Sequence, residues 1–301
     1  MKAAQIEKYG GKEVVKINDV SRPVPGPGEL LCEVWAAGLN PFDWKIRQGY
    51  AKQMIPLQLP ATLGIDFSGV VVETGGAVFG QANIMKAGAF AEFALTNPAA
   101  VSPKPDSMSH TEAAALPIAG VSALQALLEY MKLSRNQKIL IHGGAGGIGT
   151  FAIQLAKHLG AYVATTATGD ELSYVREMGA DEAIDYKKQT FEDLLRDYDA
   201  VFDTVGGETY KRSFKALKRG GIIVSMLEQP NTELGNQYGV TAIYQNTQAT
   251  SERLAKLAKF VVDGVIKVHI DKTFPLEQAG DALAYLQEGR HRGKVVLEIK
   301  K

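Results

Sequence analysis

The stretch His142-Gly143-Gly144-Ala145-Gly146-Gly147-Ile148-Gly149 decides the fold of this chain. It directly follows an apolar run typical of a strand, residues 138–142, and directly precedes a helix-like segment, residues 150–157. Gly144, Gly146 and Gly149 have the G-x-G-x-x-G spacing of a dinucleotide-binding turn, where glycine permits a tight bend and close approach of a pyrophosphate. The N-terminus of the following helix offers free N–H groups to an anion. We therefore predict that residues 143–149 bind the phosphates of a dinucleotide.

The sequence around this turn alternates between strand and helix patterns. Short apolar runs at 162–166, 183–185, 200–203 and 221–225 are separated by helical segments or turns. This alternation predicts an α/β fold with a doubly wound parallel sheet of the Rossmann type. The first hundred or so residues instead have β-branched runs between Gly and Pro clusters, which indicates a mostly β region. After a polar loop at 228–245 we expect a helix at 251–263, a strand near 267–270, a helix at 276–288 and a last strand at 294–299.

Composition bounds the class of protein. The 301 residues suffice for about two domains. Lys plus Arg and Asp plus Glu both number 33, so no excess of positive charge favours nucleic acid as a partner. The one cysteine, Cys32, lies in an apolar run, so we expect a buried core residue and neither a disulfide nor a multi-cysteine zinc site. The sequence has no membrane-spanning run and no apolar signal-peptide core, and we expect a cytoplasmic protein.

The end of the strand after the glycine turn indicates which dinucleotide binds. NAD enzymes usually carry Asp or Glu there to bind a ribose hydroxyl, but residues 164–169 contain no carboxylate. The hydroxyls of Thr166 and Thr168 can donate hydrogen bonds to a 2′-phosphate. NADPH is therefore favoured over NADH, although Asp170 and Glu171 follow closely and the loop has no Arg or Lys.

The histidines show no metal-ligand spacing, so we predict no metal site. His142 is most simply a packed residue at a strand end, and the alternative is a pocket residue. Residues 290–294 suggest a solvated turn, while contact of Lys294 with a cofactor phosphate is the alternative.

Several separated motifs resemble the medium-chain dehydrogenase/reductase superfamily, and within it the zinc-free quinone oxidoreductase branch, along nearly the whole chain. The motifs are residues 37–43 (AGLNPFD), 63–69 (LGIDFSG), 116–123 (LPIAGVSA), 202–207 (FDTVGG) and 292–296 (RGKVV). Zinc-dependent members carry a Cys near Asn40 and a Gly-His-Glu where this chain has Gly64-Ile65-Asp66, so the resemblance implies metal-free catalysis. Many quinone reductases of the group have Lys where this chain has Glu171, and Tyr where it has Lys45.

The resemblance implies a Rossmann NADP-binding domain, residues 117–263, inserted into a GroES-like mostly β domain, residues 1–116 plus 264–301, with the active cleft between them. It places Asn40 and Ser122 near the nicotinamide, with Lys45 on the substrate side, and Val205 beside the cofactor. Tyr186 matches a family tyrosine on the 2′-phosphate side. Family habit favours a homodimer. The family also has longer connections near Gly76 and Met85, and we expect that residues are missing from this sequence there.

The function implied is an NADPH-dependent reductase that transfers a hydride to a quinone or an α,β-unsaturated carbonyl. Two alternatives stay open: an enoyl or alkenal double-bond reductase of the same superfamily, and a non-catalytic NADPH-binding protein that senses redox state. The expected partner is a small quinone or enone substrate, and neither nucleic acid nor a membrane is expected.

Overall fold

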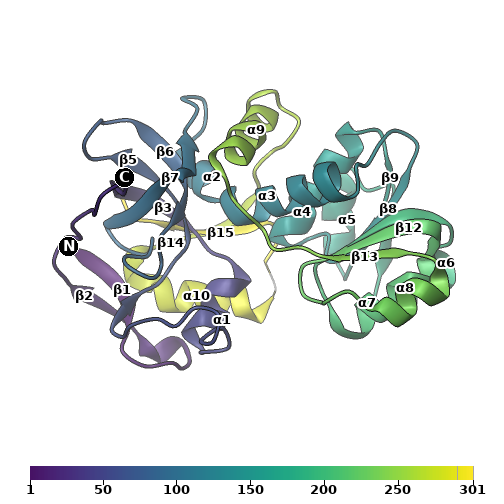
Figure 1. Cartoon of the computed structure of the whole chain (residues 1–301), viewed down its shortest axis with the longest axis horizontal. Coiled ribbons are helices and arrows are strands. Elements are labelled where there is room, and N and C mark those ends of the chain that lie inside the picture. The colour runs from purple at the N-terminus through teal and green to yellow at the C-terminus, as the bar shows by residue number, and fades with distance from the viewer. Residues whose placement is uncertain (290, 301) are drawn as a thin grey trace. The chain divides into compact units, whose positions relative to one another are not determined.

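The computed structural model describes residues 1–289 and 291–300, which form two compact units. The first unit comprises residues 1–121, 249–264 and 268–301, and the second comprises residues 122–248 and 265–267. Figure 1 shows a mostly β first unit and a second unit in which helices flank a sheet. The predicted combination of a Rossmann-type parallel sheet with a mostly β unit is confirmed.

The second unit contains a six-stranded sheet in which every pairing is parallel, in the order β10-β9-β8-β11-β12-β13. Its apolar strands are buried because helices cover both faces, as in other all-parallel sheets. The elements are β8 (Lys138–Ile141), α4 (Gly147–His158), β9 (Tyr162–Ala167), α5 (Glu171–Glu177), β10 (Glu182–Asp185), α6 (Phe191–Leu194), β11 (Tyr198–Asp203), α7 (Gly207–Ser213), η3 (Phe214–Ala216), β12 (Leu217–Ser225), α8 (Thr232–Tyr238) and β13 (Thr241–Tyr244).

The expected polar loop at 228–245 is wrong, because it contains the short helix α8 and the edge strand β13. The side chain of Asn231 caps α8 by accepting a hydrogen bond from the Leu234 N–H, and Gly239 ends the helix in the left-handed conformation. β13 has only four residues and pairs on one side with β12, so its sequence carries little strand signal.

The first unit contains a three-stranded sheet, β2-β1-β4, and a six-stranded sheet, β14-β15-β3-β5-β6-β7, which the additional β3–β7 pairing closes toward a barrel. Its core includes Cys32, which is fully buried, and burial raises the pKa of this thiol to about 12, so the predicted inert core cysteine is confirmed. The elements are β1 (Lys2–Ile6), η1 (Lys12–Val14), β2 (Val15–Asp19), β3 (Leu30–Gly38), α1 (Pro41–Arg47), β4 (Ala61–Thr62), β5 (Asp66–Val71), β6 (Ala77–Ala82), β7 (Phe93–Pro103), α2 (His110–Ala114), β14 (Ile270–Pro275), η4 (Leu276–Gln278), α10 (Ala279–Glu288) and β15 (Lys294–Glu298).

Three helical segments lie near the points where the chain passes from one unit to the other. They are α3 (Pro117–Leu124), the π-helix η2 (Gln125–Tyr130) and α9 (Ser251–Val262). The units differ from the expected domains chiefly in α9, which packs with the first unit and not with the Rossmann unit. It buries Leu254 and Leu257, and Leu257 lies so close to Gly120 that any side chain there would collide with it.

The connection between β5 and β6 is a tight turn in which the Val71 N–H donates to the Gly76 oxygen at 2.9 Å. A second turn follows at Asn83, whose oxygen accepts from the Ala87 N–H at 2.9 Å. Both connections are thus short and hydrogen-bonded in the given sequence, and the expectation of missing residues near Gly76 and Met85 stays a prediction.

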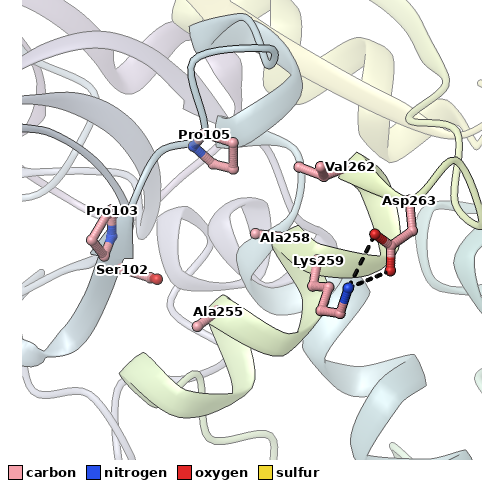
Figure 2. Close-up of a pocket in the computed structure, with 8 residues that line it drawn as sticks. All are labelled: Ser102, Pro103, Pro105, Ala255, Ala258, Lys259, Val262 and Asp263. Atoms are coloured by element: carbon pink, nitrogen blue, oxygen red, sulfur yellow. Dashed lines mark hydrogen bonds and ion pairs between the residues drawn. The ribbon is translucent and has the colours of Figure 1, made fainter.

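A shallow groove of 380 Å³ lies between α9 and the end of β7. Figure 2 shows its lining, which includes the ion pair between Lys259 and Asp263 at 2.8 Å. None of the candidate site residues lines this groove. Among the helices of the described residues, none combines the length and apolar character needed to cross a bilayer.

Candidate cofactor and acceptor sites

The glycine turn has the shape that an anion site requires. Gly143 takes a left-handed φ of +67°, and the Gly144 N–H donates to the Thr166 oxygen at 3.1 Å, which ties the turn to β9. α4 begins at Gly147, and Gly146 caps it with no side-chain hydrogen bond. The first N–H groups of a helix have no partner within the helix. In α4 these groups belong to residues of the half-exposed turn, so they are available to a bound anion.

Side-chain space around the glycines tests whether this turn fits a dinucleotide. A Cβ at Gly144 would overlap the Thr165 side chain, and one at Gly149 would overlap the Gly143 oxygen, so packing requires glycine at both positions. A Cβ at Gly146 would meet only the Gly143 oxygen, at 3.4 Å. The surface at Gly146 is therefore open, and the turn fits a pyrophosphate laid against the helix N-terminus.

A series of buried hydrogen bonds connects the turn to α7, and the position of each proton follows from the Thr209 carbonyl oxygen, which can only accept. The Ser213 hydroxyl donates to the Thr209 oxygen at 2.6 Å, so it accepts from His142 Nε2–H at 2.9 Å. His142 Nδ1 is then the acceptor, and the Thr166 hydroxyl donates to it at 3.1 Å. Burial lowers the pKa of His142 to about 3, which keeps the ring neutral. The packed strand-end interpretation of His142 agrees with this geometry.

This series of hydrogen bonds corrects the prediction for Thr166. Its hydroxyl accepts the Gly143 N–H at 3.2 Å while donating to His142, and its side chain is buried. The Thr166 hydroxyl proton is therefore engaged with His142 and does not serve a 2′-phosphate. Thr166 supports the glycine turn instead.

The predicted 2′-phosphate side lies where β9 and β10 end together, since Asp185 is opposite Ala167 in the parallel register. The Thr168 hydroxyl donates to Asp185 Oδ1 at 3.5 Å, and Tyr186 next to it is half exposed. Lys187 and Lys188, which sequence reasoning missed, are exposed at the same sheet edge. The sequence did contain a signal for them. Both lysines follow the predicted strand 183–185, and neighbouring parallel strands end at the same edge of a sheet, so they could have been placed near Thr168.

Val205 lies at the end of β11 with half of its side chain exposed, and Leu227 beyond β12 is similarly exposed. The turn is held by Asp203, which is fully buried: its Oδ1 accepts the N–H groups of Val205 at 3.0 Å and Gly206 at 2.9 Å. Its Oδ2 accepts the Ser225 hydroxyl at 2.7 Å. The second unit thus presents two apolar side chains at the carboxyl edge of its sheet, where ligands of such sheets bind.

Ser122 is buried, and its hydroxyl lies 2.7 Å from the Thr247 hydroxyl. The Gln245 amide donates to the Ser122 carbonyl oxygen at 3.0 Å. Gln245 and Thr247 escaped sequence reasoning because they follow β13, the strand that was not predicted. The structure therefore places Ser122 in a polar pair at the end of the second unit's sheet.

A buried polar cluster lies in the first unit and consists of Asn40, Asp43, Asp66 and Lys294. Lys294 Nζ donates to Asn40 Oδ1 and to the Leu39 carbonyl oxygen, both at 2.7 Å. Asn40 Nδ2 donates to Asp66 Oδ2 at 2.8 Å, and the Asn40 backbone N–H donates to Asp43 Oδ2 at 2.7 Å.

The cluster corrects two expectations for Lys294. The solvated turn is wrong at this residue, which is 3% exposed because it begins the internal strand β15 between β14 and β3. Contact with a cofactor phosphate does not fit either, since the ammonium points to Asn40 and Leu39. Of the rest of the segment, His291 and Arg292 are half buried, and residue 290 lies outside the described residues.

Burial raises the pKa of Asp43 to about 7 and that of Asp66 to about 6. The pKa of an Asp in the unfolded chain is near 4. When the pKa in the folded state is higher, the free energy of unfolding falls as the pH rises from the unfolded-state pKa to the folded-state pKa. We expect Asp43→Asn to stabilise the protein more at pH 8 than at pH 5, by on the order of 3 kcal/mol. Urea unfolding of both proteins at the two pH values measures this difference. An equal effect at both would show that Asp43 ionises normally in the fold.

Lys45 lies on α1, half buried, with its Nζ 5.7 Å from the centre of the Trp44 ring. It is not hydrogen-bonded to the buried polar cluster in the described structure, and its place on the substrate side stays a prediction. Within residues 1–289 and 291–300, no group of three or more His, Cys, Asp or Glu side chains is arranged to hold a metal ion.

Comparison with known proteins decides the family. A model of the alcohol dehydrogenase GroES-like domain matches residues 26–106, and a model described as zinc-binding dehydrogenase matches residues 178–297. The 2-methylene-furan-3-one reductase of Solanum lycopersicum is 36% identical over 99% of this chain and 79% of its own length. The chain belongs to the medium-chain dehydrogenase/reductase superfamily.

Other members of this superfamily narrow the branch to quinone oxidoreductases and alkenal reductases. The NADPH-dependent alkenal/one oxidoreductase of Arabidopsis thaliana is 35% identical over 99% of this chain and 79% of its own length. The quinone oxidoreductase structure from Coxiella burnetii has a TM-score of 0.94 at 34% identity and covers 100% of this chain and 99% of that one. The Escherichia coli quinone oxidoreductase complexed with NADPH has a TM-score of 0.90 at 26% identity, with 99% and 100% covered.

Proposed function

We propose that this protein is an NADPH-dependent reductase that delivers a hydride to a quinone or an α,β-unsaturated carbonyl without a metal. The observation that carries the proposal is the open glycine turn at a helix N-terminus without a side-chain capping hydrogen bond, in a chain of this branch. NADPH supplies the hydride when it is bound. The chain's own residues bind, orient and shield it: residues 143–149 hold the pyrophosphate, and Val205 and Leu227 form an apolar surface for the nicotinamide.

Metal independence is supported by the residues at the positions where zinc-dependent relatives carry ligands. Ile65 offers no ligand atom, and the Lys294 ammonium occupies the side of Asn40 where a cation would have to bind. A quinone or enone spreads the incoming charge over a conjugated system, so hydrogen-bond donors can stabilise it without a Lewis acid. The names of the two plant relatives favour enones as a second substrate class beside quinones.

Steady-state NADPH oxidation with a panel of quinones and enones tests the function. We expect turnover with at least one conjugated acceptor, no loss of rate with EDTA, and very slow oxidation of simple alcohols. Tight NADPH binding without turnover of any acceptor would favour the non-catalytic alternative. Activity that EDTA removes and zinc restores would contradict a metal-free mechanism.

We also propose that the 2′-phosphate of NADPH lies at the end of β9 and β10, near Thr168, Tyr186, Lys187 and Lys188. Replacing both lysines with glutamate should weaken NADPH binding about 10-fold or more while NADH binding changes little, because only NADPH carries the extra dianion. Nicotinamide fluorescence titration measures both affinities. The double variant Lys215→Glu/Lys256→Glu, at two exposed lysines on η3 and α9, controls for the same change in net charge. An equal loss for both cofactors would place the 2′-phosphate elsewhere.

A homodimer is proposed as the assembly, supported by β13, whose outer edge pairs with no other strand in the described part of the chain. Sedimentation velocity would show a species of twice the 32.4 kDa chain mass. The cytoplasmic location stays a prediction.

A further inference from the structure

We propose that Lys294 is a positioning residue that fixes the side-chain amide of Asn40, so that one N–H of this amide is held as a donor for the oxygen of the hydride acceptor. This inference rests on the proposed reductase function for the role of the donor. The arrangement of the amide itself is independent of that function.

The orientation of the Asn40 amide follows from the chemistry of its two neighbours. An ammonium can only donate, so Lys294 must face the amide oxygen, to which it donates at 2.7 Å. Asp66 Oδ2 also accepts the Ile118 N–H, and it accepts from Asn40 Nδ2 at 2.8 Å. A flipped amide would set NH₂ against NH₃⁺ and oxygen against a carboxylate oxygen, so both contacts would turn repulsive.

The three residues come from separate elements, which makes the amide a fixed point of the first unit. Asn40 precedes α1, Asp66 begins β5 and Lys294 begins β15. The Asn40 backbone is fixed as well, because its N–H donates to Asp43 Oδ2. All four side chains are nearly or fully buried, so water does not compete for these contacts.

The placement of Lys294 is not that of a simple buried ion pair. Among the described residues, no ion pair of 4.0 Å or less joins Lys294 to Asp43 or Asp66. Burial lowers the pKa of Lys294, and the charges of Asp66 and Asp43 oppose this lowering, so both carboxylates lie nearby. The amide of Asn40 stands between the ammonium and Asp66. An ammonium on the amide oxygen withdraws electron density from the group, which makes its N–H groups stronger donors.

One donor of this amide is left over. Nδ2 carries two hydrogens, and the described residues provide an acceptor for one of them, Asp66 Oδ2. A fixed and polarised N–H is the kind of group that stabilises charge developing on a carbonyl oxygen during hydride transfer, because it needs no reorganisation when the charge appears.

The test compares Lys294→Met, Asp66→Asn and the double variant in the full-length protein. Lys294→Met leaves buried carboxylates without their cation and should lower stability; adding Asp66→Asn removes one of these charges and should restore part of it. We expect kcat to fall about 10- to 100-fold in Lys294→Met, with the NADPH Kd within about twofold of the parent. The double variant should keep a similar deficit in kcat relative to Asp66→Asn alone. Lys272→Met, an exposed lysine on β14, is the matched control.

A readout without cofactor or substrate completes the design. The side-chain ¹H–¹⁵N signals of Asn40, assigned by their absence in Asn40→Asp, should shift and exchange faster with water in Lys294→Met and stay unchanged in Lys272→Met. Unchanged Asn40 signals in Lys294→Met would overturn the positioning role, whether or not the protein is a reductase. Recovery of kcat together with stability in the double variant would also overturn it, because Lys294 would then only neutralise charge.

Discussion

We expect Gly149→Ala to raise the NADPH Kd more than about 100-fold, because the new methyl group would collide with backbone on both sides of the turn. A Cβ at Gly149 would overlap the Gly143 oxygen and would lie 2.6 Å from the Gly144 Cα. Backbone atoms cannot rotate away as a side chain can, so the turn must open and α4 must move from the strand. Fluorescence titration with NADPH and thermal unfolding measure the two consequences.

Gly146→Ala separates binding from folding at the same turn. Its Cβ would meet only the Gly143 oxygen at 3.4 Å, and its φ of −75° suits alanine, so the protein should unfold at the parental temperature. The methyl group would nevertheless occupy the surface proposed for the pyrophosphate, and the NADPH Kd should rise about 10-fold or more. Gly76→Ala, an equally open glycine in the first unit, should change neither quantity. Unaltered NADPH affinity in Gly146→Ala would move the pyrophosphate away from this turn.

Asp203→Ala is expected to lower the free energy of unfolding by about 3–5 kcal/mol and to weaken cofactor binding. The substitution leaves two buried backbone N–H groups, of Val205 and Gly206, and the Ser225 hydroxyl without their acceptor. Since those contacts shape the turn that presents Val205, the loss affects both the fold and the apolar surface proposed for the nicotinamide.

Asp203→Asn should cost less, about 1–2 kcal/mol, because an amide oxygen can still accept from Val205 and Gly206 while its NH₂ cannot accept from Ser225. Urea unfolding of both variants gives the ranking, with the exposed Asp193→Ala as the control for removal of a carboxylate. If Asp203→Ala and Asp203→Asn were equally stable, the two N–H contacts would contribute nothing measurable.

The sequence by itself determined the parts of this protein that depend on neighbouring residues. The glycine turn could be located because its three glycines lie at fixed spacing within eight residues, directly between a strand-like run and a helix-like segment. The strands around it were predictable because an all-parallel sheet buries both faces, which leaves near-continuous apolar runs such as residues 138–142 and 221–225. The several separated family motifs then allowed the GroES-like unit to be expected as well.

Only the tertiary structure decided what depends on residues far apart in the chain. Lys294 follows charged neighbours that suggest solvent, yet pairing of β15 between two strands buries it beside Asn40, 254 residues away. The Thr166 hydroxyl, predicted to donate to a ligand, instead donates a hydrogen bond to His142, which follows the neighbouring strand β8. The register between β9 and β10 places Lys187 at the same sheet edge as Thr168. Local patterns encode backbone sterics and the burial of a face, whereas which polar groups meet is set by long-range packing that leaves no short-range trace in the sequence.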